Sequence, residues 1–182
     1  MGMRLSPIKK VLIAVGVLIA LFAVFVAMQP SEFRIERSIA IAAEPGSIFP
    51  LVNDLQRSTA WSPWEKLDPA IKRSFAGPAS GVGAIYSWEG NDAVGAGRLT
   101  IVESEPNARV KTRLENFRPF ESTSTLEVVL TAQGGTTRVQ WSLSGPMKFV
   151  EKAVCLFVSM EKILGPKFEE GLGMLKGLAE AR

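Results

Sequence analysis

Few side chains in this chain could carry chemistry, because the sequence contains no histidine and only one cysteine, Cys155. Histidine is the commonest general base and zinc ligand in proteins, and its absence also removes every Ser-His or Cys-His nucleophile pair. A single cysteine cannot form an intramolecular disulfide. We therefore expect a domain that folds without a metal, a cofactor or a disulfide, and the sequence assigns no catalytic residue.

The remaining acid–base candidates are isolated carboxylates and the only tyrosine, Tyr86. Asp54, Glu89 and Glu103 are the nearest candidates for a general acid or base, but nothing in their spacing pairs them. Carboxylates of this kind are mostly exposed, although catalysis by carboxylates alone does exist. Whether the chain is an enzyme is therefore left open by its residues.

Aromatic and methionine side chains form the second group of candidates. Rigid aromatic groups with few polar partners are typical of pockets for apolar ligands, whereas most such groups simply fill a core. Two polar residues lie on the apolar side of their predicted strand and could orient a ligand. The candidate pocket residues are Trp61, Trp64, Tyr86, Trp88, Thr112, Asn116, Trp141, Phe157 and Met160.

Two sets of basic residues allow alternative interpretations. Arg37 falls on the apolar side of its predicted strand, where we expect a bulge or strand end to turn it outward; the alternative is an inward anchor for a carboxylate or phosphate. The row Arg109, Lys111 and Arg113 is expected to be a solvated sheet face. Contact with anionic lipid is its alternative.

All of the candidate residues follow an apolar run near the N-terminus. Val11–Met28 contains no charged side chain, and about 20 apolar residues suffice for a helix to cross a bilayer. The run is longer than the apolar part of a signal peptide and lacks a clean small-x-small cleavage site after it. We predict a retained transmembrane helix over residues 11–29.

Charge on either side of this run predicts its orientation. Arg4, Lys9 and Lys10 precede it with no acidic residue, whereas the residues that follow it are of mixed charge. Basic flanks stay in the cytoplasm, so residues 1–10 should be a cytoplasmic tail and residues 31–182 a periplasmic or extracellular domain. Three of the 21 basic residues precede Met28 and all 18 acidic residues follow it. The domain therefore has no net charge, and nucleic-acid binding is not expected.

The pattern after the apolar run predicts an α+β domain. Alternation over 33–42 indicates a strand, helical spacing follows around residues 48–55, and about six short antiparallel strands lie between Tyr86 and Leu143, with Gly134-Gly135 as a hairpin signal. From Phe149 an apolar stripe with helical spacing runs to Leu175, and Gly165-Pro166 is expected to kink or interrupt this helix. The simplest packing lays this long helix across the apolar face of a curved sheet.

These segments resemble the START/Bet v 1-like superfamily, and within it the bacterial SRPBCC proteins, the polyketide cyclase/dehydrase and lipid transport family. The resemblance rests on the segments IERSIAIAAEPGSIFPLVNDL at 35–55, WSPWEKLDP at 61–69, GVGAIYSWEGN at 81–91, VGAGRLTIVESEPN at 94–107 and GPKFEEGLGMLKGL at 165–178. It implies a helix-grip fold with an apolar cavity between the sheet and the C-terminal helix. It also implies that the 61–64 loop lies near the cavity mouth.

The expected function is a membrane-anchored binding module for an apolar small molecule or lipid, with the membrane as its first partner. A cyclase or dehydratase that uses the same cavity is one alternative, and a protein-interaction domain of a membrane complex is another, because one fold hosts many functions. An open cavity would favour binding, a buried carboxylate facing it would favour an enzyme, and a filled core would favour interaction. The ligand and the oligomeric state are not predictable from the sequence.

Overall fold

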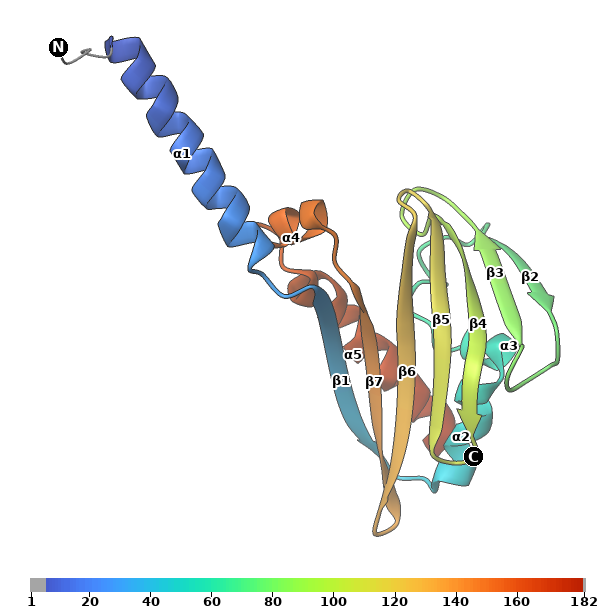
Figure 1. Cartoon of the computed structure of the whole chain (residues 1–182). Coiled ribbons are helices and arrows are strands. Elements are labelled where there is room, and N and C mark those ends of the chain that lie inside the picture. The colour runs from blue at the N-terminus through green and yellow to red at the C-terminus, as the bar shows by residue number, and fades with distance from the viewer. Residues whose placement is uncertain (1–5, 182) are drawn as a thin grey trace. The chain divides into compact units, whose positions relative to one another are not determined.

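The computed structural model describes residues 6–181, which divide into two units. The first unit contains the N-terminal segment up to Glu32 together with Met147–Ser159, and the second contains Phe33–Pro146 together with the chain from Met160 onward (Figure 1). Arg4, which contributes to the predicted orientation, lies outside the described residues.

The first unit contains two helices, α1 (Pro7–Ala27) and α4 (Phe149–Cys155). Ser6 caps α1 because its side chain accepts a hydrogen bond from the backbone N–H of Lys9, and Pro7 occupies the first helical position, where no N–H is needed. Helix α1 has the length and composition to cross a membrane, and nearly all of its side chains are exposed. The predicted apolar helix is therefore present, and its insertion stays a prediction.

The second unit is built on one sheet of seven strands in the order β1-β7-β6-β5-β4-β3-β2. From β2 to β7 each strand pairs antiparallel with the next one along the chain. Helices α2 (Pro45–Asn53) and α3 (Leu55–Ser58) precede this run, and α5 (Met160–Glu180) follows it. The strands are β1 (Glu32–Ile41), β2 (Lys72–Ala76), β3 (Ile85–Glu89), β4 (Ala96–Glu105), β5 (Arg109–Arg118), β6 (Ser122–Gln133) and β7 (Thr136–Pro146).

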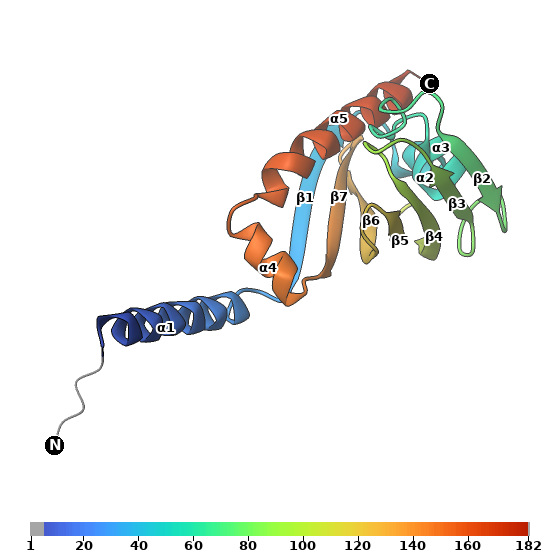
Figure 2. The same cartoon turned by 90° about the horizontal axis from the view of Figure 1, so that it is seen from above.

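The predicted fold of the domain is confirmed, and so is the hairpin that was predicted at Gly134-Gly135. Gly134 and Gly135 both have positive φ, as a two-residue hairpin of type I′ requires, and they connect the paired residues Gln133 and Thr136. Helix α5 runs along one face of the sheet (Figure 2). We call this face of the sheet the inner face.

The C-terminal helix differs from its predicted form. The break lies over residues 156–159, between α4 and α5, and Pro166 lies inside α5. Gly165 does not end a helix. A Cβ at this position would lie 2.2 Å from Nη2 of Arg37. The glycine therefore makes room for a guanidinium group on the helix surface, which a sequence pattern alone does not reveal.

Candidate functional site

The centre of the inner face is apolar and partly exposed. Leu99 in β4 lies opposite Leu114 in β5, and Leu126 in β6 lies opposite the buried Thr112. The three leucines are only partly buried, although they pack against the core. Because side chains alternate between the two faces of a sheet, this exposure opens onto the side where α5 lies.

One part of the inner face is filled by rings. Trp141 of β7 stacks on Phe168 of α5 with 4.1 Å between ring centroids. Trp61 and Trp64, from the loop after α3, meet Trp141 edge-on at 5.0 and 6.0 Å. The indole N–H of Trp61 donates to the carbonyl of Leu51. Three candidate pocket residues thus come together, and here they form packed core.

A second aromatic row follows β2 and β3 on the same face. Phe75 stacks on Tyr86 with 5.1 Å between ring centroids, and Tyr86 lies 5.8 Å from Trp88. Trp88 lies over Gly97, where a Cβ would come within 2.5 Å of its ring, and its indole N–H donates to the carbonyl of Val94. The indole is fixed by these contacts but stays partly exposed beside the leucines.

Tyr86 belongs to a charged hydrogen-bond network. Its hydroxyl donates to Oε1 of Glu65 at 2.5 Å, and Arg73 donates from Nε to Oε2 of the same carboxylate at 2.7 Å. Burial and the neighbouring Glu65 carboxylate raise the pKa of Tyr86, and the hydrogen bond to Glu65 raises the pKa of Arg73. The phenol is therefore held protonated at neutral pH.

Polar groups lie at one end of the partly exposed leucine patch. Asn116 of β5 is opposite Ser122 of β6, and the Asn116 side-chain amide donates to the Ser122 hydroxyl at 2.9 Å. Ser124, one pair further along on the same face, is buried. The inner face thus combines apolar surface with a small number of hydrogen-bonding groups, which is the composition of most sites for small apolar ligands.

Two predicted pocket residues lie after β7. Met160 is the first residue of α5 and is partly buried. Phe157 belongs to the unit that contains α1 and α4, and 80% of it is exposed. Phe157 therefore belongs to a different unit from the inner-face residues.

The acid–base candidates have structural partners. The Asp54 carboxylate caps α3 by accepting from the backbone N–H groups of Gln56 and Arg57. Glu89 forms an ion pair with Arg118. The hydrogen bond from Lys111 lowers the pKa of Glu103.

The basic candidates are also paired. Arg37 forms ion pairs with Glu161 and Glu169, both on α5, and therefore points toward the helix instead of being turned away by a bulge. Arg109 pairs with Glu103, Glu105 and Glu127, and Lys111 pairs with Glu103. These pairs compensate two members of the predicted basic row, as in an ordinary solvated sheet face.

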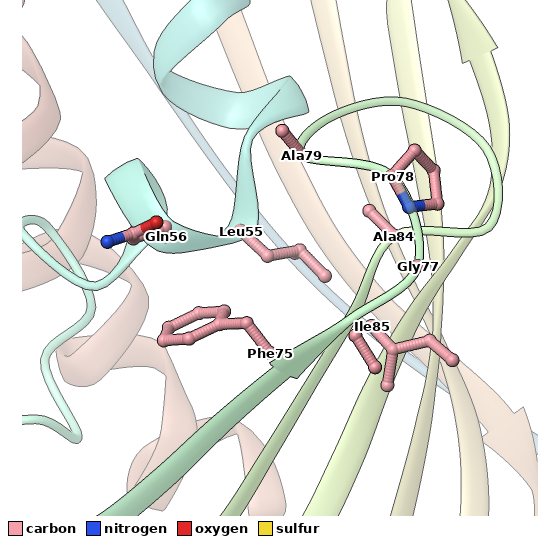
Figure 3. A pocket seen from close by; sticks show the side chains of 9 residues that line it. Leu55, Gln56, Phe75, Gly77, Pro78, Ala79, Ala84 and Ile85 are labelled. Carbon is pink, nitrogen blue, oxygen red and sulfur yellow. The ribbon is translucent and has the colours of Figure 1, made fainter.

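Two pockets lie away from most of these residues. One, of about 100 Å³, lies between α3 and the β2–β3 connection; Figure 3 shows Leu55 and Gln56 on the α3 side and Phe75 and Ile85 on the strand side. Its volume is below the roughly 300–1,000 Å³ of usual ligand pockets. The other, an open depression of about 330 Å³, involves β2–β5. It is lined by Trp88 from the predicted pocket residues and by Glu89 from the acid–base candidates, and no other candidate residue lines either of these two pockets.

Sequence reasoning missed two kinds of residue. Glu65 and Arg73 were not selected, because their partner Tyr86 is distant in the sequence and no spacing connects them. Leu114 was not selected either, although it lies between Thr112 and Asn116 on the same strand face. The same alternation that selected its neighbours could have found it.

The comparisons with known proteins agree with this geometry. The model of the family "Polyketide cyclase / dehydrase and lipid transport" matches residues 32–180, so the chain belongs to that family. No curated protein sequence matches the chain.

Solved structures with the same fold are distant in sequence. The Aha1 dimer from Colwellia psychrerythraea is 18% identical with a TM-score of 0.58, and the match covers 81% of this chain and 96% of that one. Ara h 8.0201 is 13% identical with a TM-score of 0.53, covering 83% and 99%. The di-domain ARO/CYC BexL from the BE-7585A biosynthetic pathway is 15% identical with a TM-score of 0.58, covering 87% and 54%. At these identities the likeness shows the fold alone.

Proposed function

We propose that this chain is a membrane-anchored binding protein that binds an apolar small molecule or a lipid chain on the inner face of its sheet. The observation that carries the proposal is the partial exposure of Leu99, Leu114 and Leu126 at the centre of that face. Leucines in the middle of a seven-stranded sheet are normally covered, so partly exposed ones mark a surface that a ligand could complete.

An apolar ligand suits this surface energetically. Burial of apolar surface contributes about 25 cal/mol per Å², and the leucines offer no hydrogen bonds that would favour a polar molecule. Asn116 and Ser122 lie at one end of the patch and could orient the polar end of a ligand such as a fatty acid. The packed rings around Trp141 close the other part of the face.

Tryptophan fluorescence provides the test, because all four tryptophans lie in the second unit. The full chain in lipid nanodiscs is titrated with a brominated fatty acid, whose bromine atoms quench nearby indoles. We expect saturable quenching, with Trp88 as the main reporter. Leu114→Glu should weaken binding at least tenfold, because it places a charge on the inner face. Thr125→Glu, on the neighbouring strand but the opposite face, is the control and should bind normally.

The fold of each variant is checked by circular dichroism, and Leu126→Asn serves as a milder second variant. Binding that is absent in the unsubstituted chain, or unaffected by both inner-face variants, contradicts the proposal. In that case the interaction-domain alternative takes its place.

Anchoring is the second part of the proposed function. Helix α1 is proposed to cross the inner membrane once, with residues 1–10 in the cytoplasm and the domain in the periplasm or outside the cell. A reporter fused after Arg182 should be active only outside the cytoplasm. Activity of a cytoplasmic reporter at the same position would contradict this orientation.

An acid–base enzyme is the second candidate function, and the Tyr86–Glu65–Arg73 network is the observation in its favour. The network places a phenol and a carboxylate within hydrogen-bond distance on one side of the inner face. However, a general acid works best with a pKa near the operating pH, and the pKa of Tyr86 is shifted upward, away from neutrality. Binding is therefore the function that we propose first.

A further inference from the structure

Helix α4 carries an apolar face that is not covered. Phe149, Val150 and Val154 are 51–70% exposed, and Phe157, one turn further on, is 80% exposed. Lys148, Glu151 and Lys152 occupy the remaining side of this segment. At 100° per residue the apolar and the charged side chains of α4 separate onto opposite sides, so α4 is amphipathic, and the exposed Phe157 follows it in the turn at its end.

This segment is joined to the end of α1. The ammonium group of Lys152 donates to the carbonyl of Gln29 at 2.9 Å, and the backbone N–H of Met147 donates to the carbonyl of Ser31 at 2.8 Å. Helices α1 and α4 contact one another, and Val26 in the last turn of α1 is fully buried. The polar side of α4 therefore faces the chain as it leaves α1, and the apolar side does not.

The length of α1 sets the depth of this junction in a membrane. A helix of 21 residues is about 30 Å long, which is also about the thickness of the hydrocarbon core. When α1 spans the bilayer, Ala27 lies at the edge of the hydrocarbon, and Gln29 and Ser31 lie among the lipid headgroups. The hydrogen bonds of Lys152 and Met147 then place α4 at the same level.

We propose that residues 148–158 form an interfacial segment around helix α4, whose apolar side inserts between the lipids of the leaflet into which α1 emerges. This rests on the proposed insertion of α1. Amphipathic helices at such a depth bury their apolar side roughly 5–10 Å below the headgroups. Phe149 and Phe157 are aromatic groups of the kind that bind there, and Lys148 lies on the polar side, where its ammonium group reaches the headgroups.

The continuity with α1 favours lipid over a protein partner. A protein partner would have to reach a face that α1 holds at the membrane surface, whereas lipid is already present there.

The test measures lipid contact site by site in the full chain. Cys155→Ser removes the only cysteine, and single cysteines are introduced by Phe157→Cys, Val150→Cys and Lys148→Cys. Val82→Cys is the matched control, because Val82 is an equally apolar residue with 59% exposure in the loop between β2 and β3. Ala20→Cys in α1 reports insertion of the anchor. Each site carries an environment-sensitive fluorophore, and the chain is reconstituted in phosphatidylcholine vesicles containing lipids with a nitroxide just below the headgroup.

We expect labels at 157 and 150 to be quenched severalfold more by the nitroxide lipids than the label at 148, and the label at 82 to be quenched by aqueous iodide only. If the label at 20 is quenched by lipid but those at 157 and 150 respond only to iodide, the anchor is correct and the interfacial segment is wrong. If 157 and 150 are shielded from both quenchers, a protein covers this face and the lipid assignment is overturned. If the label at 20 also fails to contact lipid, the proposed anchoring itself fails.

Discussion

Helices α4 and α5 follow β7 in one apolar stripe, but only α5 is covered by protein. In α5, Phe168 and Leu172 are almost completely buried against the sheet and its loops, whereas in the segment that begins with α4, Phe149 and Phe157 are exposed. Both segments have the same spacing of large apolar side chains. The difference lies in what each one packs against, since α5 meets the rings of Trp141 and Trp64.

This comparison shows that an apolar stripe with helical spacing predicts burial but does not identify what covers the apolar side. The sheet covers the apolar side of α5. For α4 we propose that lipid covers the apolar side. This is possible because apolar side chains that insert into a membrane no longer carry the free-energy cost of contact with water. The two segments should therefore lose very different amounts of stability when a phenylalanine is removed.

The largest expected effect is that of Phe168→Ala. Removal of a fully buried ring leaves a cavity and should lower the free energy of unfolding by about 3–5 kcal/mol. The matched variant Phe157→Ala should change it by less than about 0.5 kcal/mol, because that side chain is exposed. Chemical denaturation followed by tryptophan fluorescence measures both. Equal losses in the two variants would mean that Phe157 is part of the core.

The next effect tests the close approach of α5 to the sheet. A Cβ at Gly171 would lie 2.7 Å from the Trp141 ring, which neighbouring rings hold in place, and 3.2 Å from Pro63. Gly171→Ala should therefore destabilise the domain by about 1–3 kcal/mol. Gly173→Ala has no neighbour within 4 Å and should instead stabilise the helix by up to about 1 kcal/mol. Thermal unfolding of the two variants gives the comparison, and a stabilising Gly171→Ala would contradict the packed interface.

The sequence predicted the parts of the molecule in which local pattern and burial agree. Alternation over 33–42 and the glycines at 134 and 135 corresponded to β1 and the β6–β7 hairpin. The helix is interrupted over residues 156–159 and not at Gly165-Pro166, where a kink or an interruption was expected. Gly165 instead admits Arg37, a contact between positions far apart in the chain. Local rules cannot see such a contact.

The candidate site was predictable only in part for the same reason. Trp61, Trp64 and Trp141 were selected as aromatic groups, but whether they line a pocket or fill a core depends on Phe168, which packs among them only after folding. Phe157 was grouped with them by helical spacing, but it follows the end of α4 and belongs to the other unit, where it is exposed. The Tyr86–Glu65 bond joins a strand to a loop that contains no regular pattern.

Alkaline pH should affect the stability of the sheet domain, through Tyr86, and not the exposed segment around Phe157. The pKa of Tyr86 is raised in the folded state, so its contribution to stability is complete below the unfolded pKa of about 10 and is lost as pH rises above it. Tyr86 is the only tyrosine, so tyrosinate absorbance reports this group alone. We expect it to ionise only as the domain unfolds.

Two controls accompany this measurement. Tyr86→Phe should lower the free energy of unfolding by about 1–2 kcal/mol at neutral pH through loss of the hydrogen bond to a charged acceptor, and it should remove part of the alkaline dependence. Lipid contact of a label at 157 should stay unchanged in that variant at neutral pH. Ionisation of Tyr86 near its ordinary pKa in the folded domain would show that its bond to Glu65 is not formed in solution.

The smallest expected effect concerns Arg37, which marks where the covered part of the stripe begins. Its guanidinium group forms ion pairs with Glu161 and Glu169, one before and one after Gly165, and thereby ties the first turns of α5 to β1. Arg37→Met keeps the apolar part of the side chain but removes the charge. Because partly exposed ion pairs contribute little to global stability, the unfolding midpoint should change only slightly.

Hydrogen exchange in Arg37→Met should nevertheless become faster over residues 161–165 and stay unchanged at residues 172–175, whose packing does not involve Arg37. Arg37→Lys keeps a charge without the two-sided geometry and should give an intermediate rate. Unchanged exchange at 161–165 in both variants would mean that apolar packing alone fixes the start of α5.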